Sequence, residues 1–83
     1  MATILYFGRL ADVAGGSEAK VELPPHVTDT GALRDWLGRD DPALGLELRH
    51  PSVRIAVNQE VAVGDIAIGS GDEIAFLAPM SGG

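Results

Sequence analysis

Short segments in which apolar and polar residues alternate constrain the fold of this chain most strongly. Residues 18–23 (EAKVEL) and 53–57 (VRIAV) alternate in this way, which indicates strands with one buried face. Residues 3–8 (TILYFG) and 72–77 (DEIAFL) are rich in β-branched and aromatic residues and are also predicted to be strands. Because the chain has only 83 residues, these strands must share one small core.

One segment has the pattern of a longer amphipathic helix. Thr28 and Asp29 are both good N-cap residues, and we expect the helix to run from there to about Leu37 and to end at Gly38. The apolar stripe that would pack on a sheet comprises Leu33, Trp36 and Leu37.

Shorter elements fill the remaining sequence. Residues 9–14 are predicted to form a helix that ends at the glycines 15–16, and the Asp-Pro pair at 41–42 is typical of the start of another short helix. Residues 58–59 (NQ) have the composition of a tight turn, after which residues 60–63 return as a short strand.

The order of these elements predicts an α+β fold. Two strands, a helix and further strands are best accommodated by a β-grasp, a mixed sheet with one main helix packed across it. In this arrangement the first and last strands lie side by side in the centre. Residues 1–78 would then form the domain, and residues 79–83 a flexible tail that extends from its best-anchored strand.

Composition excludes several classes of function. Six basic residues stand against twelve acidic ones, and the resulting charge of −6 disfavours nucleic acids and anionic membranes as partners. The chain has no cysteine, which excludes disulfides, thiolate metal sites and a cysteine nucleophile. No apolar stretch approaches the ~20 residues of a membrane span, and Met1 is not followed by the basic patch of a signal peptide. We therefore expect a cytoplasmic protein.

Candidate catalytic and metal-binding side chains are sparse. His26 and His50 each stand beside a proline with no second ligand at a suitable spacing, so we expect loop histidines and no metal site. Asp72 and Glu73 open a strand and alternate between its faces, so their carboxylates cannot converge on one atom. The sequence predicts that the chain is not an enzyme by itself and binds no cofactor of its own.

The C-terminal tail has specific physical properties. Its last four residues can extend ~13–14 Å, and without Cβ atoms Gly82 and Gly83 can enter a channel too narrow for other residues. The terminal carboxylate is ionised at neutral pH and can attack an activated phosphate. Pro79 stiffens the departure point because it fixes φ. Such a tail suits chemistry in another protein's active site.

The predicted sheet gives a second indication of a partner. If Ile74 and Phe76 face the core, Leu77 faces away from it, together with Leu5 and Phe7 of the first strand. The strand at 60–63 would add Val61 or Val63 to the same face. An exposed apolar patch of this kind marks a protein interface. The alternative is that a loop or helix covers these side chains.

Three segments resemble the small subunit of molybdopterin synthase. They are TILYFGRLADVAG near the start of the chain, VNQE at 57–60 and, above all, the terminal run GDEIAFLAPMSGG. That family comprises ubiquitin-like β-grasp proteins that carry sulfur in molybdenum cofactor biosynthesis. The resemblance spans the whole chain.

The resemblance implies a mechanism. An enzyme related to ubiquitin E1 proteins uses ATP and Mg²⁺ to adenylate the carboxylate at the position of Gly83, and a sulfur donor converts the adenylate to a thiocarboxylate. The tail then enters the large synthase subunit, in a heterotetramer, where sulfur passes to cyclic pyranopterin monophosphate.

The resemblance also implies a set of partner-binding positions, which are Phe7, Val61, Leu77, Pro79, Met80 and Ser81. The sequence departs from the family pattern at Ala78, where a second proline is frequent, and at Met80, where valine is frequent. Both differences bear on affinity for partners and leave the terminal glycines unchanged.

Two alternative functions remain open. One is a related carrier for thiamine synthesis or tRNA thiolation, or a ubiquitin-like protein modifier, although thiamine carriers generally lack a helix at the position of residues 9–14. The other is a non-catalytic interaction domain, which would keep its function after deletion of Gly82 and Gly83.

Overall fold

The computed structural model describes residues 1–78, which form five strands and three helices. In chain order these are β1 (Ala2–Phe7), α1 (Arg9–Ala14), β2 (Glu18–Val21), α2 (Thr30–Asp40), α3 (Pro42–Leu48), β3 (Arg54–Val57), β4 (Glu60–Val61) and β5 (Glu73–Leu77).

The strands form one mixed sheet in the order β2-β1-β5-β3-β4. The first and last strands are parallel neighbours in its centre, and the other pairs are antiparallel. A parallel pair needs a long crossover connection, and the whole middle of the chain, including α2, provides it. The predicted α+β β-grasp with β1 and β5 side by side is therefore confirmed.

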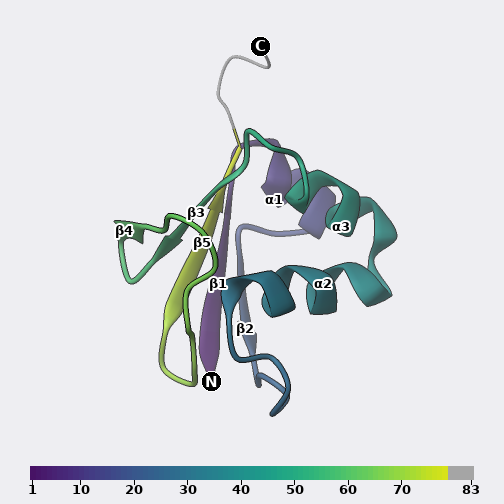
Figure 1. Cartoon of the computed structure of the whole chain (residues 1–83). Coiled ribbons are helices and arrows are strands. Elements are labelled where there is room, and N and C mark those ends of the chain that lie inside the picture. The colour runs from purple at the N-terminus through teal and green to yellow at the C-terminus, as the bar shows by residue number, and fades with distance from the viewer. Residues whose placement is uncertain (79–83) are drawn as a thin grey trace.

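The hydrophobic core lies between the sheet and the helices, which gather on one side of the sheet (Figure 1). The aromatic rings of Tyr6 on β1 and Phe76 on β5 stack in it, with centroids 6.0 Å apart. Burial raises the pKa of the Tyr6 hydroxyl, and the nearby Asp41 carboxylate adds to this effect. The other buried apolar residues of the core are Ala2, Ile4, Leu10, Val27, Leu33, Leu44, Leu48, Ile55 and Ile74.

Residues around the start of α2 anchor the long loop before β5. The Asp29 side chain caps the helix by accepting a hydrogen bond from the Ala32 N–H (2.7 Å), as predicted for one of the two candidate caps. Thr30 is fully buried, and its hydroxyl accepts a hydrogen bond from the Ile66 N–H (3.1 Å). The Thr30 N–H in turn donates to the Ile66 carbonyl (3.0 Å), so the loop is fixed to the helix.

The predicted end of α2 at Gly38 is wrong. The helix continues to Asp40, and Asp41 then caps α3 by accepting a hydrogen bond from the Leu44 N–H (3.2 Å). Gly38 serves helix packing instead, because a Cβ atom there would lie 2.8 Å from the Cα of Gly45 on α3. By contrast, Gly15 does end α1, in the left-handed conformation with φ 83°.

Two strands are shorter than predicted. β2 ends at Val21 because that residue already pairs with Ala2, so β1 has almost no chain left to pair with residues 22–23. β4 ends at Val61, soon after which Gly64 turns the chain away with φ 75°, and Val63 is left 93% exposed. Both boundaries depend on where the partner strand is available.

No helix within residues 1–78 is long and apolar enough to cross a membrane.

The close contact between α2 and α3 generates a stability prediction. In a helix interior, alanine is more favourable than glycine by about 1 kcal/mol. We nevertheless expect Gly45→Ala to lower the free energy of unfolding by about 1–3 kcal/mol. The reason is that its Cβ would lie 2.7 Å from the Gly38 Cα. Chemical denaturation measures the change. Gly69→Ala is the control, because nothing lies within 4 Å of that Cβ position, and it should leave stability nearly unchanged.

Candidate functional site

The face of the sheet opposite the helices presents two cross-strand rows of mainly apolar side chains. Strand register places Leu5, Ala75, Ala56 and Val61 in one row, and Phe7, Leu77 and Arg54 in the next. The apolar members form what we call the outer patch: Leu5, Phe7, Ala56, Val61, Ala75 and Leu77.

The side chains at the ends of the outer patch are exposed to solvent, and those in its middle are largely buried. Phe7 is 47% and Val61 67% exposed, so no loop or helix of residues 1–78 covers them. Leu5 and Leu77 are half-buried. Ala75 also faces outward but is only 7% exposed, because larger neighbours flank this small residue in the central strand. The predicted apolar face is therefore present, with Phe7 and Val61 as its most accessible large side chains.

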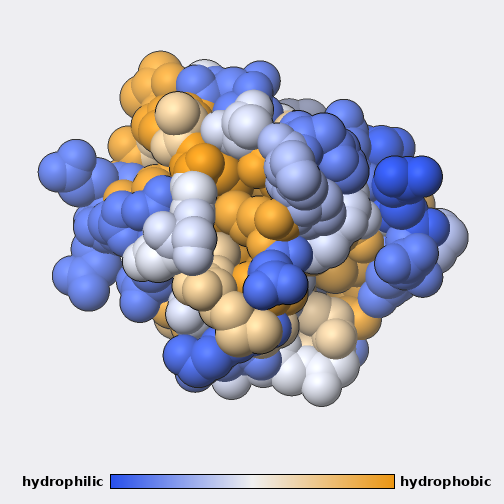
Figure 2. All heavy atoms as spheres, turned by 90° about the horizontal axis from the view of Figure 1, so that it is seen from below, coloured by the Kyte–Doolittle hydropathy of each residue, from blue (hydrophilic) through white to orange (hydrophobic). Residues whose placement is uncertain are grey.

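In Figure 2, hydrophobic atoms gather at the upper left, on the side where Figure 1 places the β3–β4 hairpin. Hydrophilic atoms predominate on the right of the same view.

The central strand β5 ends at one end of the outer patch. Leu77 ends β5 directly beside Phe7, the last residue of β1, and Ala78 packs against the core. A Cβ atom on Gly8 would lie 3.6 Å from the Ala78 Cβ. The residues that follow β1 and β5 therefore remain close to each other after the strands end. The predictions for Pro79, Met80, Ser81, Gly82 and Gly83 lie outside the described residues.

The β3–β4 turn is tied to the start of β5 by Asn58. Asn58 and Gln59 both have positive φ (51° and 71°), the conformation of the tight hairpin turn that was predicted. The Asn58 side chain donates a hydrogen bond to Asp72 Oδ1 (3.0 Å) and accepts one from the Glu73 N–H (3.0 Å). The turn thus holds β4, and with it Val61, against the central strands.

The Asp72 carboxylate is stabilised in its ionised form by the same network. The hydrogen bond from Asn58 lowers the pKa of this carboxyl, and the Gly69 N–H, which donates to Oδ2 at 2.8 Å, lowers it further. The network therefore fixes both a turn and a negative charge.

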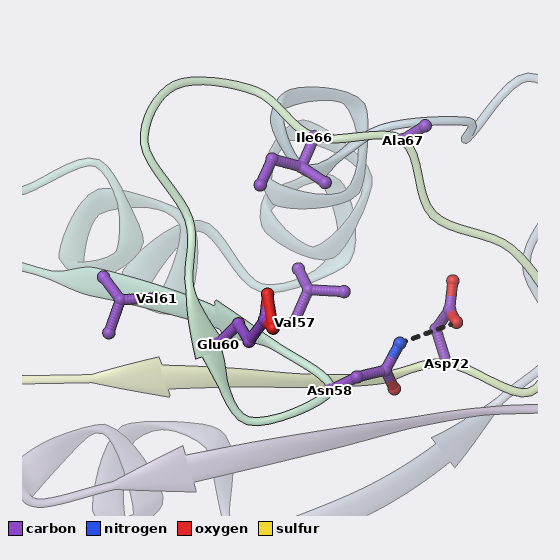
Figure 3. A pocket seen from close by; sticks show the side chains of 7 residues that line it. All are labelled: Val57, Asn58, Glu60, Val61, Ile66, Ala67 and Asp72. Atoms are coloured by element: carbon purple, nitrogen blue, oxygen red, sulfur yellow. Dashed lines mark hydrogen bonds between the residues drawn. The ribbon is translucent and has the colours of Figure 1, made fainter.

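An open cavity of about 410 Å³ lies between the hairpin and the loop at residues 66–67 (Figure 3). Its lining residues are Val57, Asn58, Glu60, Val61, Ile66, Ala67 and Asp72. The walls combine aliphatic side chains with two carboxylates and an amide, and they offer no nucleophile with an adjacent general base.

The histidines lie in exposed turns, as predicted. His26 follows Pro25 in a turn, and the His50 ring is hydrogen-bonded to the Ser52 hydroxyl (2.6 Å). Among residues 1–78 no group of three or more potential metal ligands comes together. What this part of the chain supplies is an apolar surface that includes Leu77, the last residue of β5.

Comparison with known proteins shows the family of this chain. Residues 4–83 match the ThiS family. The chain belongs to the ThiS family. Because the match starts within β1 and extends to the last residue, it includes both the outer patch and the tail.

This ThiS-family chain is similar to two curated sulfur carrier subunits and to one solved structure of a different name. It is 32% identical over 80 residues to the molybdopterin synthase sulfur carrier subunit of Mycobacterium tuberculosis, which covers 96% of this chain and 94% of that protein. The subunit of the same name from Homo sapiens is also 32% identical, with coverage of 96% and 91%. The crystal structure of SAMP1 from Haloferax volcanii superposes with a TM-score of 0.81 at 30% identity, covering 99% of this chain and 98% of that one.

Two features of this ThiS-family surface were not predicted from sequence. One is the link from Asn58 to Asp72, two residues that lie 14 positions apart and meet only because β3 pairs with β5. The available signal was that Asn tolerates positive φ and that its side chain can bond nearby backbone. The other is the position of Arg54 beside Leu77, which follows from the register of the same pair of strands.

The Asn58 network generates a prediction about pH. We expect Asn58→Gly, which keeps the positive φ accessible, to raise the Asp72 pKa toward its ordinary value and to lower stability at pH 7. The hydrogen bond from the Gly69 N–H remains and keeps this pKa partly lowered. A carboxyl whose pKa is lowered in the folded state stabilises the protein at pH values above its ordinary pKa. This contribution is lost as the pH falls through the pKa of the folded state. NMR titration measures the pKa, and denaturation at several pH values measures stability.

Gln59→Gly is the matched control for the turn, because Gln59 also has positive φ and its side chain makes no hydrogen bond within the described chain. It should leave the Asp72 pKa unchanged. The difference in stability between wild type and Asn58→Gly should narrow below about pH 3.9. A difference that stays constant down to pH 2 would contradict the proposed role of the network.

Proposed function

We propose that this chain is the sulfur carrier subunit of molybdopterin synthase and bears a thiocarboxylate at Gly83. The observation that carries the proposal is that β5, the central strand, ends at Leu77 within the exposed outer patch, and that the sequence continues from there to Gly82 and Gly83. The full-length similarity to sulfur carrier subunits of that name supports it.

Sulfur would be loaded in two steps. The Gly83 carboxylate attacks the α-phosphorus of ATP in the active site of an E1-like enzyme, with Mg²⁺ bound there, and pyrophosphate leaves. A nucleophilic sulfur donor at the oxidation level of hydrosulfide then attacks the carbonyl carbon of the acyl-adenylate. A C–S bond forms, the C–O bond to AMP breaks, AMP leaves, and the thiocarboxylate remains. The chain contributes only the carboxylate, which agrees with the absence of cysteine from its sequence and with a role that is not catalytic by itself.

Delivery would take place in the large subunit of the synthase, in a heterotetramer. Phe7, Val61 and Leu77 of the outer patch dock on that subunit, and residues 79–81 lead Gly82 and Gly83 into its active site. There the thiocarboxylate sulfur forms a C–S bond to cyclic pyranopterin monophosphate, and water then cleaves the acyl C–S bond, which leaves sulfur on the pterin and regenerates the Gly83 carboxylate. No cofactor bound to the carrier itself takes part, and we place the reaction in the cytoplasm.

The β-grasp is well suited to this delivery. β5 is hydrogen-bonded on both sides, to β1 and to β3, so force on the tail is resisted by the centre of the sheet. A partner that grips the outer patch therefore also fixes the origin of the tail.

A second candidate function is attachment to other proteins as a modifier. This candidate is supported by the similarity to SAMP1 of Haloferax volcanii. A second similar structure from that organism is named small archaeal modifier protein 1. In that case a lysine amine would attack the same activated Gly83 carbonyl, AMP would leave, and an amide bond would form. The outer patch and the tail would serve both functions.

Intact mass spectrometry tests the proposal. The full-length chain is incubated with its cognate E1-like enzyme, ATP, Mg²⁺ and a sulfur source. We expect the mass gain of one oxygen replaced by sulfur, and no gain for the variant that lacks Gly83. Conjugates of higher mass that contain a lysine-linked tail would favour the modifier instead. If neither product forms while the enzyme loads a control carrier, the proposal is wrong.

Docking through the outer patch is tested with a matched pair of variants. Val61→Asp places a charge on the patch, and we expect it to weaken binding to the cognate large subunit at least ~10-fold, because an unpaired charge would be desolvated there. Leu46→Asp makes the same change at a residue of α3 that is 72% exposed in the helix layer, and it should have no effect. Calorimetric titration measures both affinities, and thermal denaturation verifies that both variants fold.

A further inference from the structure

Arg54 is the charged residue of the row that leads to the tail. It is the first residue of β3, and register places it directly opposite Leu77, which in turn pairs with Phe7. Residues opposite each other in an antiparallel pair have Cβ atoms ~4.5–5.5 Å apart. The guanidinium is thus attached next to the point where β5 ends and the tail begins.

Arg54 lies on the outer face and is exposed. Its strand neighbour Ile55 is buried in the core, so the alternation of β3 turns Arg54 to the side of the sheet without helices. Ala56, the next residue on this side, belongs to the outer patch. The arginine therefore borders the outer patch on the surface that we propose for docking.

Arg54 forms no ion pair with any residue from 1 to 78. The cations that do so in this part of the chain are Arg9 with Glu47 (2.9 Å), Lys20 with Glu18 (3.7 Å) and Arg49 with Asp35 (3.5 Å). Glu73, on the same face in β5, lies four residues before Leu77, a separation of ~13 Å along the strand. An acidic chain thus has, among its described residues, a cation without an ion-pair partner at the end of an apolar surface.

This arrangement favours a particular chemistry in the partner. An apolar contact excludes water around Arg54, and a desolvated guanidinium must be paired to avoid a large free-energy cost. The planar guanidinium binds a carboxylate through two parallel hydrogen bonds, which fixes orientation as well as charge. A surface that contacts Phe7 and Leu77 without an acidic group would leave Arg54 unpaired.

We propose that Arg54 is a specificity-determining residue for docking, and that it pairs with an aspartate or glutamate at the edge of an apolar site on the synthase large subunit. This inference rests on the proposed function. It adds that the partner's surface is acidic beside the entrance for the tail, although the carrier itself has a net charge of −6. A partner with a neutral or basic group at that position would bind more weakly, because the Arg54 guanidinium would remain unpaired in the contact.

Binding of charge variants to the cognate large subunit tests the proposal. At low salt we expect Arg54→Glu to weaken binding about 30-fold and Arg54→Gln about 5-fold, because loss of a pair in a desolvated contact leaves the partner's carboxylate unpaired. Arg39→Glu is the control. It makes the same change in charge at an exposed residue in the last turn of α2, and it should weaken binding less than 2-fold.

A second measurement identifies the partner group. Each acidic residue on the docking face of the large subunit is changed to lysine in turn, and one such variant should restore the binding of Arg54→Glu at least 5-fold. The affinity of wild type should also fall more steeply with salt than that of Arg54→Gln. Absence of any restoring variant would contradict the proposal.

The remaining outcomes separate this inference from the proposed function. If Arg54→Glu behaves like Arg39→Glu while Val61→Asp still weakens binding, the role of Arg54 is wrong and docking through the outer patch stands. If Val61→Asp has no effect either, the proposed docking itself is wrong. Analytical ultracentrifugation of the isolated chain tests whether a second copy of this chain binds the outer patch. If the wild type forms dimers and Arg54→Glu dissociates them, Arg54 serves self-association, and the proposal is overturned.

Discussion

The parallel pairing of β1 with β5 is the interaction on which the rest of the molecule depends. It joins the two ends of the domain in the centre of the sheet and brings Ile4, Tyr6, Ile74 and Phe76 onto one buried surface. The same pairing places Phe7 beside Leu77 on the other face. One set of backbone hydrogen bonds thus organises the core, the outer patch and the origin of the tail, so none of these can move independently.

The two faces of the sheet have different tasks. The inner face is covered by residues from all three helices of the described chain, and it provides stability through burial of apolar area. The outer face exposes Phe7 and Val61, which nothing in residues 1–78 covers, and this gives up some stability and leaves a surface for a partner. Arg54 at the end of this surface adds orientation and charge, properties that apolar contacts alone provide poorly.

The chemistry that we propose is divided between proteins. Among residues 1–78 no group of three or more potential metal ligands comes together, and the reactive group of the proposed carrier is its terminal carboxylate. Such a division requires that an activating enzyme and an acceptor enzyme each bind the carrier with the same terminal carboxylate in the active site. A small rigid domain with one apolar face and a glycine terminus satisfies this requirement, because each enzyme supplies its own active site around the same tail.

Local patterns in the sequence were sufficient to predict most elements, the β-grasp and the existence of an apolar outer face. Alternation in VRIAV, the cap at Asp29 and the asparagine turn at Asn58 are decided within a few residues, where propensity and hydrogen bonding act locally. The end of α2, the short β4 and the partners of Asn58 and Arg54 were decided only by tertiary structure. Gly38 continues a helix because Gly45 packs against it, and Arg54 borders the outer patch because β3 pairs with β5 in one register. Contacts between residues distant in the chain set these features, and a single sequence carries no direct record of such contacts.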